Sequence, residues 1–187
     1  EQCRLVEVPP GDDQILCAEC QGDLGIGGRV WDGCFVLLDY LASNSDLLEG
    51  KRCLELGSGT GLLGISCVLM GANEVCLTDL EDVVPLLELN IHINRHFNPL
   101  LHRNAALQRL DARAHRWGSD ISGLIEPDLV LMAEVVYNAE ASRALVQTLL
   151  SLATGRQMPK FIMCYRNRNE DDPVFFASLQ AAGFEVL

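Results

Sequence analysis

The chain has 187 residues, of which 49% are hydrophobic, so it is long and apolar enough to bury a core, and intrinsic disorder is excluded. Its formal net charge of −12 argues against a nucleic-acid-binding protein, which normally carries a basic face. The charge favours a basic partner instead, although acidity also serves solubility alone. No apolar run reaches the ~18 residues of a membrane-spanning helix, and nothing points to secretion or to a membrane.

Eight cysteines raise the question of disulfides or a metal site. Several stand inside apolar runs, as Cys53 does in KRCLEL and Cys76 in EVCLTD, which is typical of small buried hydrophobic residues. Cys17 and Cys20 form a CxxC pair, but no second pair follows at a spacing that would complete a zinc site. We therefore expect free thiols, no bound metal and a reducing compartment, namely the cytoplasm and also the nucleus.

The first half of the chain begins with two strand-like runs and then alternates between helix and strand patterns. The predicted elements are, in order, a hairpin of strands at 4–8 and 14–19, a glycine-rich lead-in at 22–28, a helix from 32 to about 43–44, a strand at 52–56, a helix at 62–70, a strand at 74–78 and a helix at 82–94. Pro9, Pro10 and Gly11 mark a broad turn within the hairpin.

The second half continues the alternation. It contains a weak strand at 105–110, a strong buried strand at 128–133, a helix at 139–153, a strand at 160–165, a helix at 173–182 and the start of a further strand at 184–187. Short apolar strands that alternate with helices predict an α/β fold, a mostly parallel, Rossmann-like sheet with helices on both faces, here preceded by the hairpin. We expect one domain over 1–187 in which a final C-terminal strand is missing.

The strongest local signal is the segment ELGSGTG at 55–61, between a strand and a helix. Gly57, Gly59 and Gly61 let the backbone turn tightly and approach a ligand closely. Dinucleotide-binding enzymes have the spacing GxGxxG, which leaves room for a pyrophosphate, whereas the spacing here is GxGxG after the acidic Glu55. This form resembles motif I of S-adenosylmethionine (SAM)-dependent methyltransferases.

An acidic residue, Asp79, follows at the end of the next predicted strand. A carboxylate in this place can accept hydrogen bonds from both ribose hydroxyls of a nucleoside. Glu81 and Asp82 come just after it and are better explained as acids that complement the dipole at the start of a helix. The loop and Asp79 together predict a nucleoside-containing cofactor.

At larger scale the chain resembles the seven-β-strand, class I protein-lysine methyltransferases of the valosin-containing-protein lysine methyltransferase group. The resemblance extends from about residue 22 to 186 and depends on the order and spacing of several segments. These segments are VWDGCFVLLDYL, CLELGSGTGLLGI, VCLTDLEDVVPLLELNI, RWG and DLVLMAEVVYN. It implies that SAM is bound, that S-adenosylhomocysteine (SAH) is released, and that a lysine of another protein is the acceptor.

The resemblance also implies roles for particular residues. Cofactor binding is assigned to Trp31, Glu55, Gly57, Ser58, Gly59, Thr60, Asp79, Leu80, Trp117 and Ala133, with Asp79 on the ribose and Leu80 and Trp117 near the adenine. Trp31 and Trp117 are equally typical of core anchors, because large aromatic residues usually pack in cores. Ala133 ends the fourth strand of the sheet, where ligands bind in such folds.

The family's D-x-x-Y signature corresponds here to Glu134-Val135-Val136-Tyr137, with Glu in place of Asp. The charge is kept and the side chain is one methylene longer. The resemblance makes Glu134 and Tyr137 the catalytic residues that handle the acceptor. His92 and His96 share a helix face, but Ile93 stands where zinc proteases need a glutamate, so we expect a solvated face there.

Several functions stay open on the sequence alone. A histidine, small-molecule or nucleic-acid acceptor is possible, although the motif lacks the two prolines of many base-amine methyltransferases. A non-catalytic scaffold with this fold is a second alternative, against which the intact loop and Asp79 argue. We expect a monomer that acts on a lysine-bearing protein substrate and does not act on nucleic acid.

Overall fold

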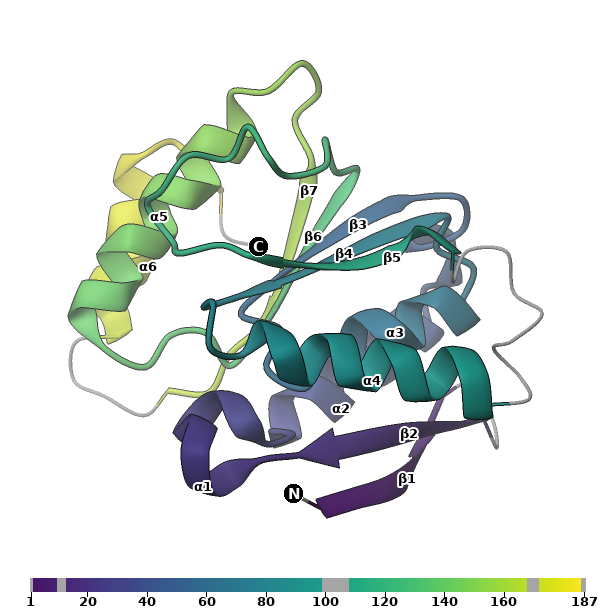
Figure 1. Ribbon diagram of the computed structural model, residues 1–187. Helices are drawn as coiled ribbons and strands as arrows, with labels where there is room; N and C mark the ends of the chain where they lie inside the picture. The colour runs from purple at the N-terminus through teal and green to yellow at the C-terminus, as the bar shows by residue number, and fades with distance from the viewer. Residues whose placement is uncertain (1, 10–12, 99–107, 168–171, 186–187) are drawn as a thin grey trace.

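In a computed structural model, which describes residues 2–9, 13–98, 108–167 and 172–185, five parallel strands form the central sheet. Their order is β5-β4-β3-β6-β7 (Figure 1). The strands are β3 (Arg52–Leu56), β4 (Glu74–Asp79), β5 (Leu110–Ala114), β6 (Leu129–Ala133) and β7 (Lys160–Cys164). The central strands are buried on both faces, which explains why they are short continuous apolar runs. This confirms the predicted Rossmann-like sheet.

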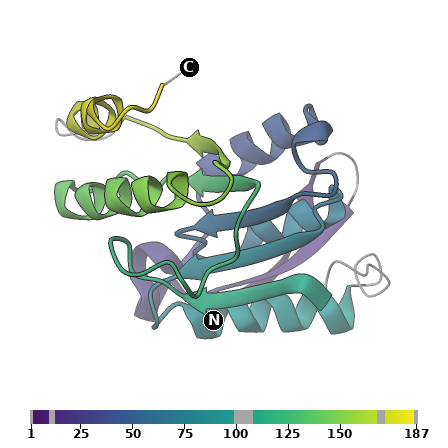
Figure 2. The same ribbon diagram turned by 90° about the horizontal axis from the view of Figure 1, so that it is seen from above.

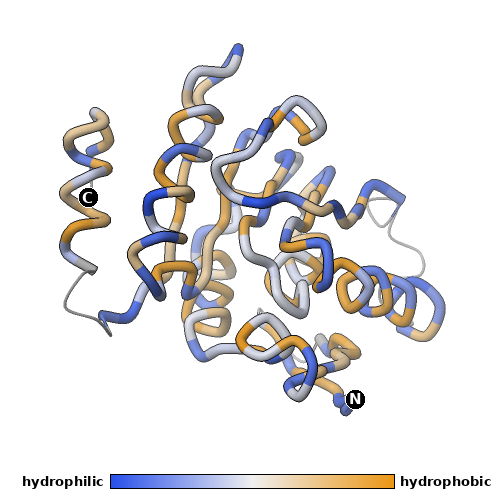
Figure 3. The backbone as a smooth tube through the Cα atoms, turned by 60° about the vertical axis from the view of Figure 1, so that its left-hand side comes forward, coloured by the Kyte–Doolittle hydropathy of each residue, from blue (hydrophilic) through white to orange (hydrophobic). Residues whose placement is uncertain are grey.

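Side chains along the strands point alternately into two cores. Cys53 and Leu129 belong to the core on one face, while Leu54 and Val130 belong to the core on the other. The first core is covered by α2 (Asp32–Ala42), α3 (Leu62–Leu69) and α4 (Val84–Phe97), and the second by α5 (Ala139–Ala153) and α6 (Asp172–Ala181). Figure 2 shows α5 and α6 together on the side of the sheet opposite α4. Hydrophobic and hydrophilic residues alternate within the turns of the helices (Figure 3).

The N-terminal hairpin, β1 (Gln2–Val8) paired with β2 (Asp13–Glu19), lies against α4 and not in the central sheet (Figure 1). Asn90 and Asn94 of α4 each exchange two hydrogen bonds with the backbone of β2. Asn90 pairs with Ala18 at 2.7 and 3.0 Å, and Asn94 pairs with Leu16 at 3.0 and 2.7 Å. The side-chain amides of a helix thus pair with the backbone of β2 as a neighbouring strand would.

Most predicted elements are found within three residues of their expected bounds, but the strand predicted at 105–110 is wrong. β5 begins at Leu110, and residues 99–107 lie outside the described part of the chain. β5 is one of the two edge strands of the sheet and is mostly exposed, so its segment DARA is polar. A polar segment of this kind resembles a loop in the sequence. The strand expected from 184 is not formed at 184–185, and 186–187 lie outside the described residues.

The lead-in at 22–28 is more ordered than predicted. It contains α1 (Gln21–Leu24) and the short 3₁₀ helix η1 (Gly25–Gly28), and a second 3₁₀ turn, η2 (Ser45–Leu47), follows α2. Glycine is required at position 28, because a Cβ atom there would lie 2.0 Å from the carbonyl oxygen of Cys20. Among the described residues, no helix combines the length and apolarity needed to cross a bilayer.

Candidate active site

The main pocket opens at the carboxyl ends of β3 and β6, where the strand order reverses. From β3 the chain adds β4 and then β5 on one side, and it returns to place β6 on the other side of β3. Loops that leave neighbouring strands in opposite directions create a crevice at such a point. The crevice here has a volume of about 490 Å³. Every residue that the sequence assigned to the site lines it: Trp31, Glu55, Gly57, Ser58, Gly59, Thr60, Asp79, Leu80, Trp117, Ala133, Glu134 and Tyr137.

The glycine-rich loop adopts a conformation that other residues would strain. Gly57 has a φ of 69° and Gly59 a φ of 54°, both in the left-handed region. A Cβ on Gly57 would also lie 3.0 Å from the Trp117 ring and 3.1 Å from a methyl group of Val135. The loop therefore stays close to Trp117, and its bare backbone forms one wall of the pocket.

Asp79 holds the loop in place from the end of β4. Its Oδ2 accepts a hydrogen bond from the backbone N–H of Gly59 at 2.8 Å, and its Oδ1 accepts one from Leu80 at 2.8 Å. Burial raises the pKa of Asp79 above its ordinary value, while these two N–H groups act against that rise. A carboxylate oxygen can accept two hydrogen bonds, and each oxygen of Asp79 accepts one from the backbone. Asp79 therefore retains the capacity to bind two ribose hydroxyls.

Glu55 and Ser58 make hydrogen bonds within the loop's own framework. The Glu55 carboxylate is 3% exposed and accepts a hydrogen bond at 3.0 Å from the backbone N–H of Gly64 in α3. Burial raises its pKa to about 8. The Ser58 hydroxyl accepts from the backbone N–H of Thr78 at 3.0 Å, and the Thr78 hydroxyl donates to the Glu55 carbonyl at 2.7 Å. These bonds fix the end of β3 against β4.

Two tryptophans lie on the pocket wall. The Trp31 indole donates to the carbonyl of Ile26 at 2.9 Å, and the guanidinium of Arg29 stacks 3.9 Å from the centre of its ring. Trp117 is partly buried, and its ring centre lies 6.0 Å from that of Tyr137. Since both rings line the pocket, both are placed to contact a flat ligand group.

Glu134 and Tyr137 stand on the turn that follows β6. Val135 and Val136 between them are buried in the second core, and this anchors the turn. Glu134 has a φ of 60°, and among the described residues it is the non-glycine residue with a left-handed backbone. Its N–H donates to the Cys164 carbonyl of β7 at 2.9 Å. Burial, followed by the nearby Asp79 charge, raises the pKa of Tyr137, which keeps its hydroxyl protonated.

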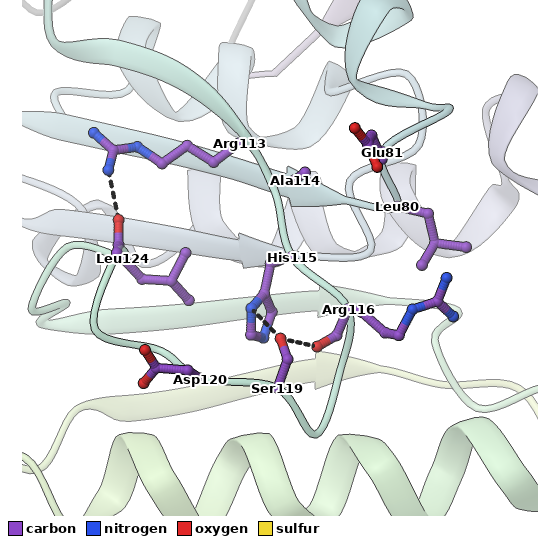
Figure 4. Close-up of a pocket in the computed structure, with 10 residues that line it drawn as sticks. Leu80, Glu81, Arg113, Ala114, His115, Arg116, Ser119, Asp120 and Leu124 are labelled. Carbon is purple, nitrogen blue, oxygen red and sulfur yellow. Dashed lines mark hydrogen bonds between the residues drawn. The ribbon is translucent and has the colours of Figure 1, made fainter.

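A second hollow, of about 400 Å³, lies beside the main pocket past the end of β5 (Figure 4). Leu80, His115 and Arg116 line both. The His115 side chain is buried against Ser119, with Nδ1 3.4 Å from the Ser119 hydroxyl, and its Nε2 has no hydrogen-bond partner among the described residues. Burial lowers the pKa of His115. The sequence analysis assigned His115 no role, since a single histidine forms no motif with its neighbours and the strand before it was predicted at the wrong residues.

Other lining residues were also missed by the sequence analysis. They lie just after the lead-in, in the first turn of α2, after β4 and β5, and at the start of α5, and they include Arg29, Cys34, Asp82, His115, Arg116, Asn138 and Glu140. Asn138 caps α5, since its side chain accepts from the N–H of Ala141 at 2.8 Å. Only their position in the chain could have indicated a role in the site, because these residues lie after strand ends or at the starts of helices, at the edge of the sheet where ligands bind.

Comparison with known proteins identifies the family. The lysine methyltransferase family matches residues 11–182. The chain belongs to this family. It is 36% identical over 159 residues to protein N-lysine methyltransferase METTL21A from Danio rerio, covering 84% of this chain and 68% of that protein. It is 33% identical over 199 residues to protein-lysine N-methyltransferase EFM6 from Saccharomyces cerevisiae, covering 92% of this chain and 76% of that protein.

Solved structures support the fold of this methyltransferase. The [4+2]-cyclase SpnF superposes with a TM-score of 0.58 at 19% identity, over 91% of this chain and 64% of that one. Magnesium protoporphyrin IX methyltransferase from Synechocystis, with bound SAM, superposes with a TM-score of 0.52 at 19% identity, over 78% of this chain and 66% of that one. The family and the fold predicted from the sequence are confirmed, and the cofactor of this family is SAM.

Proposed function

We propose that this enzyme transfers the methyl group of SAM to the side-chain nitrogen of a lysine in a protein substrate. One observation carries the proposal: Glu134 and Tyr137, placed after β6, line the same pocket as the glycine loop and Asp79. In the proposal, an acceptor site and a nucleoside site share this one crevice. Support also comes from the relatives, METTL21A and EFM6, whose names describe them as protein-lysine methyltransferases.

We assign each part of SAM to particular residues of the pocket. In the proposal, Gly57, Ser58, Gly59 and Thr60 hold the amino-acid end with Trp31 beside it, and Glu55 orients the loop from below. Asp79 binds the ribose hydroxyls, Leu80 and Trp117 contact the adenine, and Ala133 lies next to the reacting end. The left-handed backbone of Gly57 and Gly59, which brings bare main chain to the pocket wall, supports this assignment.

The sulfonium of SAM supplies an activated methyl group, so the protein's task is to bind, orient and deprotonate the acceptor. A free lysine has a pKa of ~10.4, and only its neutral amine attacks. Glu134 would bind the incoming ammonium, and Tyr137 would position its nitrogen for methyl transfer. Desolvation in the closed pocket lowers the lysine pKa, and the proton leaves to solvent before the carbon–nitrogen bond forms. Orientation supplies a large part of the acceleration.

The acidic chain suits a substrate with a basic protein surface. The proposal also holds that the enzyme works as a monomer in the cytoplasm and in the nucleus. The net charge of −12 supports a lysine-bearing partner over a polyanion. All eight cysteines are free thiols, which agrees with a reducing compartment.

The test is a labelling experiment. The enzyme is incubated with tritiated SAM and a cell lysate, and the labelled material is treated with nuclease or with protease. We expect the label to survive nuclease, to be lost from the acid-insoluble fraction after protease, and to map to methyl-lysine by mass spectrometry. Label that is lost with nuclease and kept with protease would overturn the protein substrate, and label on histidine would overturn the lysine.

A further inference from the structure

The first turn of α2 lies directly against the turn that follows β6. A Cβ atom built on Gly33 would lie 2.6 Å from Cγ of Glu134, 2.9 Å from its Cδ and 2.8 Å from its Oε1. These are the three nearest atoms to that position, and all belong to one side chain. The Glu134 side chain therefore fills the space that any other residue at position 33 would occupy.

The backbone at Gly33 does not require glycine. Gly33 is the second residue of α2, and its φ is not in the left-handed region. Glycine weakens a helix relative to alanine, so its presence there calls for another reason. The close contact with Glu134 supplies that reason, because only glycine leaves the required volume.

The backbone of Glu134 cannot move away from α2 without giving up other interactions. Its backbone has a φ of 60° and its N–H is bonded to the Cys164 carbonyl at 2.9 Å, so the start of the side chain is fixed. Val135, the next residue, is buried. A methyl group at position 33 is therefore accommodated by rotation of the Glu134 side chain, which carries the carboxylate to a new place.

We propose that Gly33 is a positioning residue for methyl transfer: its missing Cβ lets the Glu134 side chain lie over the first turn of α2 and so keeps the carboxylate at the acceptor end of the pocket. This inference rests on the proposed role of Glu134. It concerns a residue that contacts neither the acceptor nor the methyl group and that acts through Glu134 alone.

The experiment is a double-mutant cycle of Gly33→Ala and Glu134→Ala. Glu134→Ala removes Cγ, Cδ and Oε1, the atoms that a methyl group at position 33 would meet. The initial rate of tritium transfer from saturating SAM to lysate protein, SAM affinity by calorimetry and the melting temperature are measured on all four proteins. We expect Gly33→Ala to lower the rate by ~10²-fold, the scale of misplacing a reacting group by about 1 Å, with SAM affinity kept.

The expected signature is non-additivity. In the Glu134→Ala background, Gly33→Ala should change neither the rate nor the melting temperature. Gly22→Ala is the matched control, since it adds the same methyl group to α1 with no atom within 4 Å, and it should leave all three measurements unchanged.

The outcomes separate the two levels of the proposal. If Glu134→Ala keeps the normal rate, the acceptor role of Glu134 is wrong. If Glu134→Ala is slow but Gly33→Ala is normal, only the inference about Gly33 is wrong. An equal loss from Gly33→Ala in both backgrounds also overturns it, because Gly33 would then act by packing α2 and not through Glu134.

Discussion

Glu55 and Asp79 lie at the carboxyl ends of neighbouring strands, and their surroundings give them different tasks. Glu55 is 3% exposed and accepts a backbone hydrogen bond from α3, so burial dominates and its pKa rises to about 8. Asp79 reaches the pocket and accepts two backbone hydrogen bonds from its loop, which oppose the effect of burial. The first carboxyl group supports the loop, and we propose that the second one binds the cofactor.

The raised pKa of Glu55 predicts a pH-dependent stability. Between its ordinary pKa of 4.5 and about 8, the folded protein keeps a proton that the unfolded chain releases, so this group lowers stability as pH rises through that range. Glu55→Gln keeps the shape and removes the titration. We expect urea unfolding at a series of pH values to show wild type losing stability relative to Glu55→Gln as pH rises. Parallel pH curves for the two proteins would contradict the raised pKa.

Substitutions of the residues after β6 should lower the rate of methyl transfer without changing SAM affinity. Glu134→Gln keeps the shape and removes the charge, and it should lower the rate of methyl transfer by a factor of ~10² or more, as for other positioned ionisable groups. Tyr137→Phe should cost less, if the ring does most of the positioning. SAM affinity should stay the same in both variants. If Glu134→Gln lowers the melting temperature and leaves the rate per folded molecule unchanged, Glu134 is a structural acid.

At the scale of elements, α4 joins the hairpin to the cofactor loop. Asn90 donates to the carbonyls of Ala18 in β2 and of Thr60 in the loop, at 3.0 and 2.8 Å. Asn94 and Asn98 continue the row at the four-residue spacing that places side chains on one helix face, and Asn98 donates to the Gln14 carbonyl at 2.6 Å. The row satisfies the outer edge of β2, which would otherwise expose unpaired backbone groups.

This row predicts a large stability cost at one asparagine. Asn94→Ala leaves the Leu16 N–H and carbonyl without their partners, and Asn94 is fully buried. We expect a loss of ~1–3 kcal/mol in the free energy of unfolding, the cost of an unsatisfied buried polar group. Glu88→Ala, on the exposed face of the same helix, is the control and should change stability by less than ~0.5 kcal/mol. Equal effects from the two substitutions would show that the row adds no stability.

For the whole molecule, strand order decides where the ligand binds. β3 and β6 are adjacent, and the loops that leave them diverge, so the glycine loop and the Glu134 turn face one crevice. The lead-in and the start of α2 close the crevice from the side of the hairpin, where Ile26, Arg29 and Trp31 line it. The pocket is therefore built from segments that lie far apart in the sequence.

This arrangement predicts ligand selectivity. SAM and SAH should bind, and NAD and ATP should not, because the loop spacing leaves no pyrophosphate site at the start of α3. Asp79→Ala should weaken SAM binding by ~1–3 kcal/mol, the scale of hydrogen bonds to a charged group. Isothermal titration of the four ligands, with the melting temperature as a check on folding, measures both. Unchanged SAM affinity in a folded Asp79→Ala protein would remove Asp79 from the ribose site.

The helices and strands that were predicted accurately are those with a strong local pattern of apolar and polar residues. The bounds of β3 and α5 were predicted to the residue, because a buried apolar run and a capped amphipathic helix are each determined by nearby residues. β5 was misplaced because an edge strand carries polar residues that read as a loop. The glycine spacing and Asp79 identified the carboxyl edge of the sheet, and the family resemblance supplied the other predicted site residues; all of them line one pocket.

The sequence by itself determined the family, the parallel sheet and the glycine-rich loop, since each depends on the order and spacing of residue types along the chain. Only the tertiary structure decided which distant residues touch. Gly33 reads as an unremarkable helix residue until Glu134, a hundred positions later, is seen to fill the space beside it. Asn90 and Asn94 read as a polar helix face until β2 is found against them. Local pattern fixes an element, but the volume and the hydrogen-bond partners around a side chain depend on the elements that pack beside it.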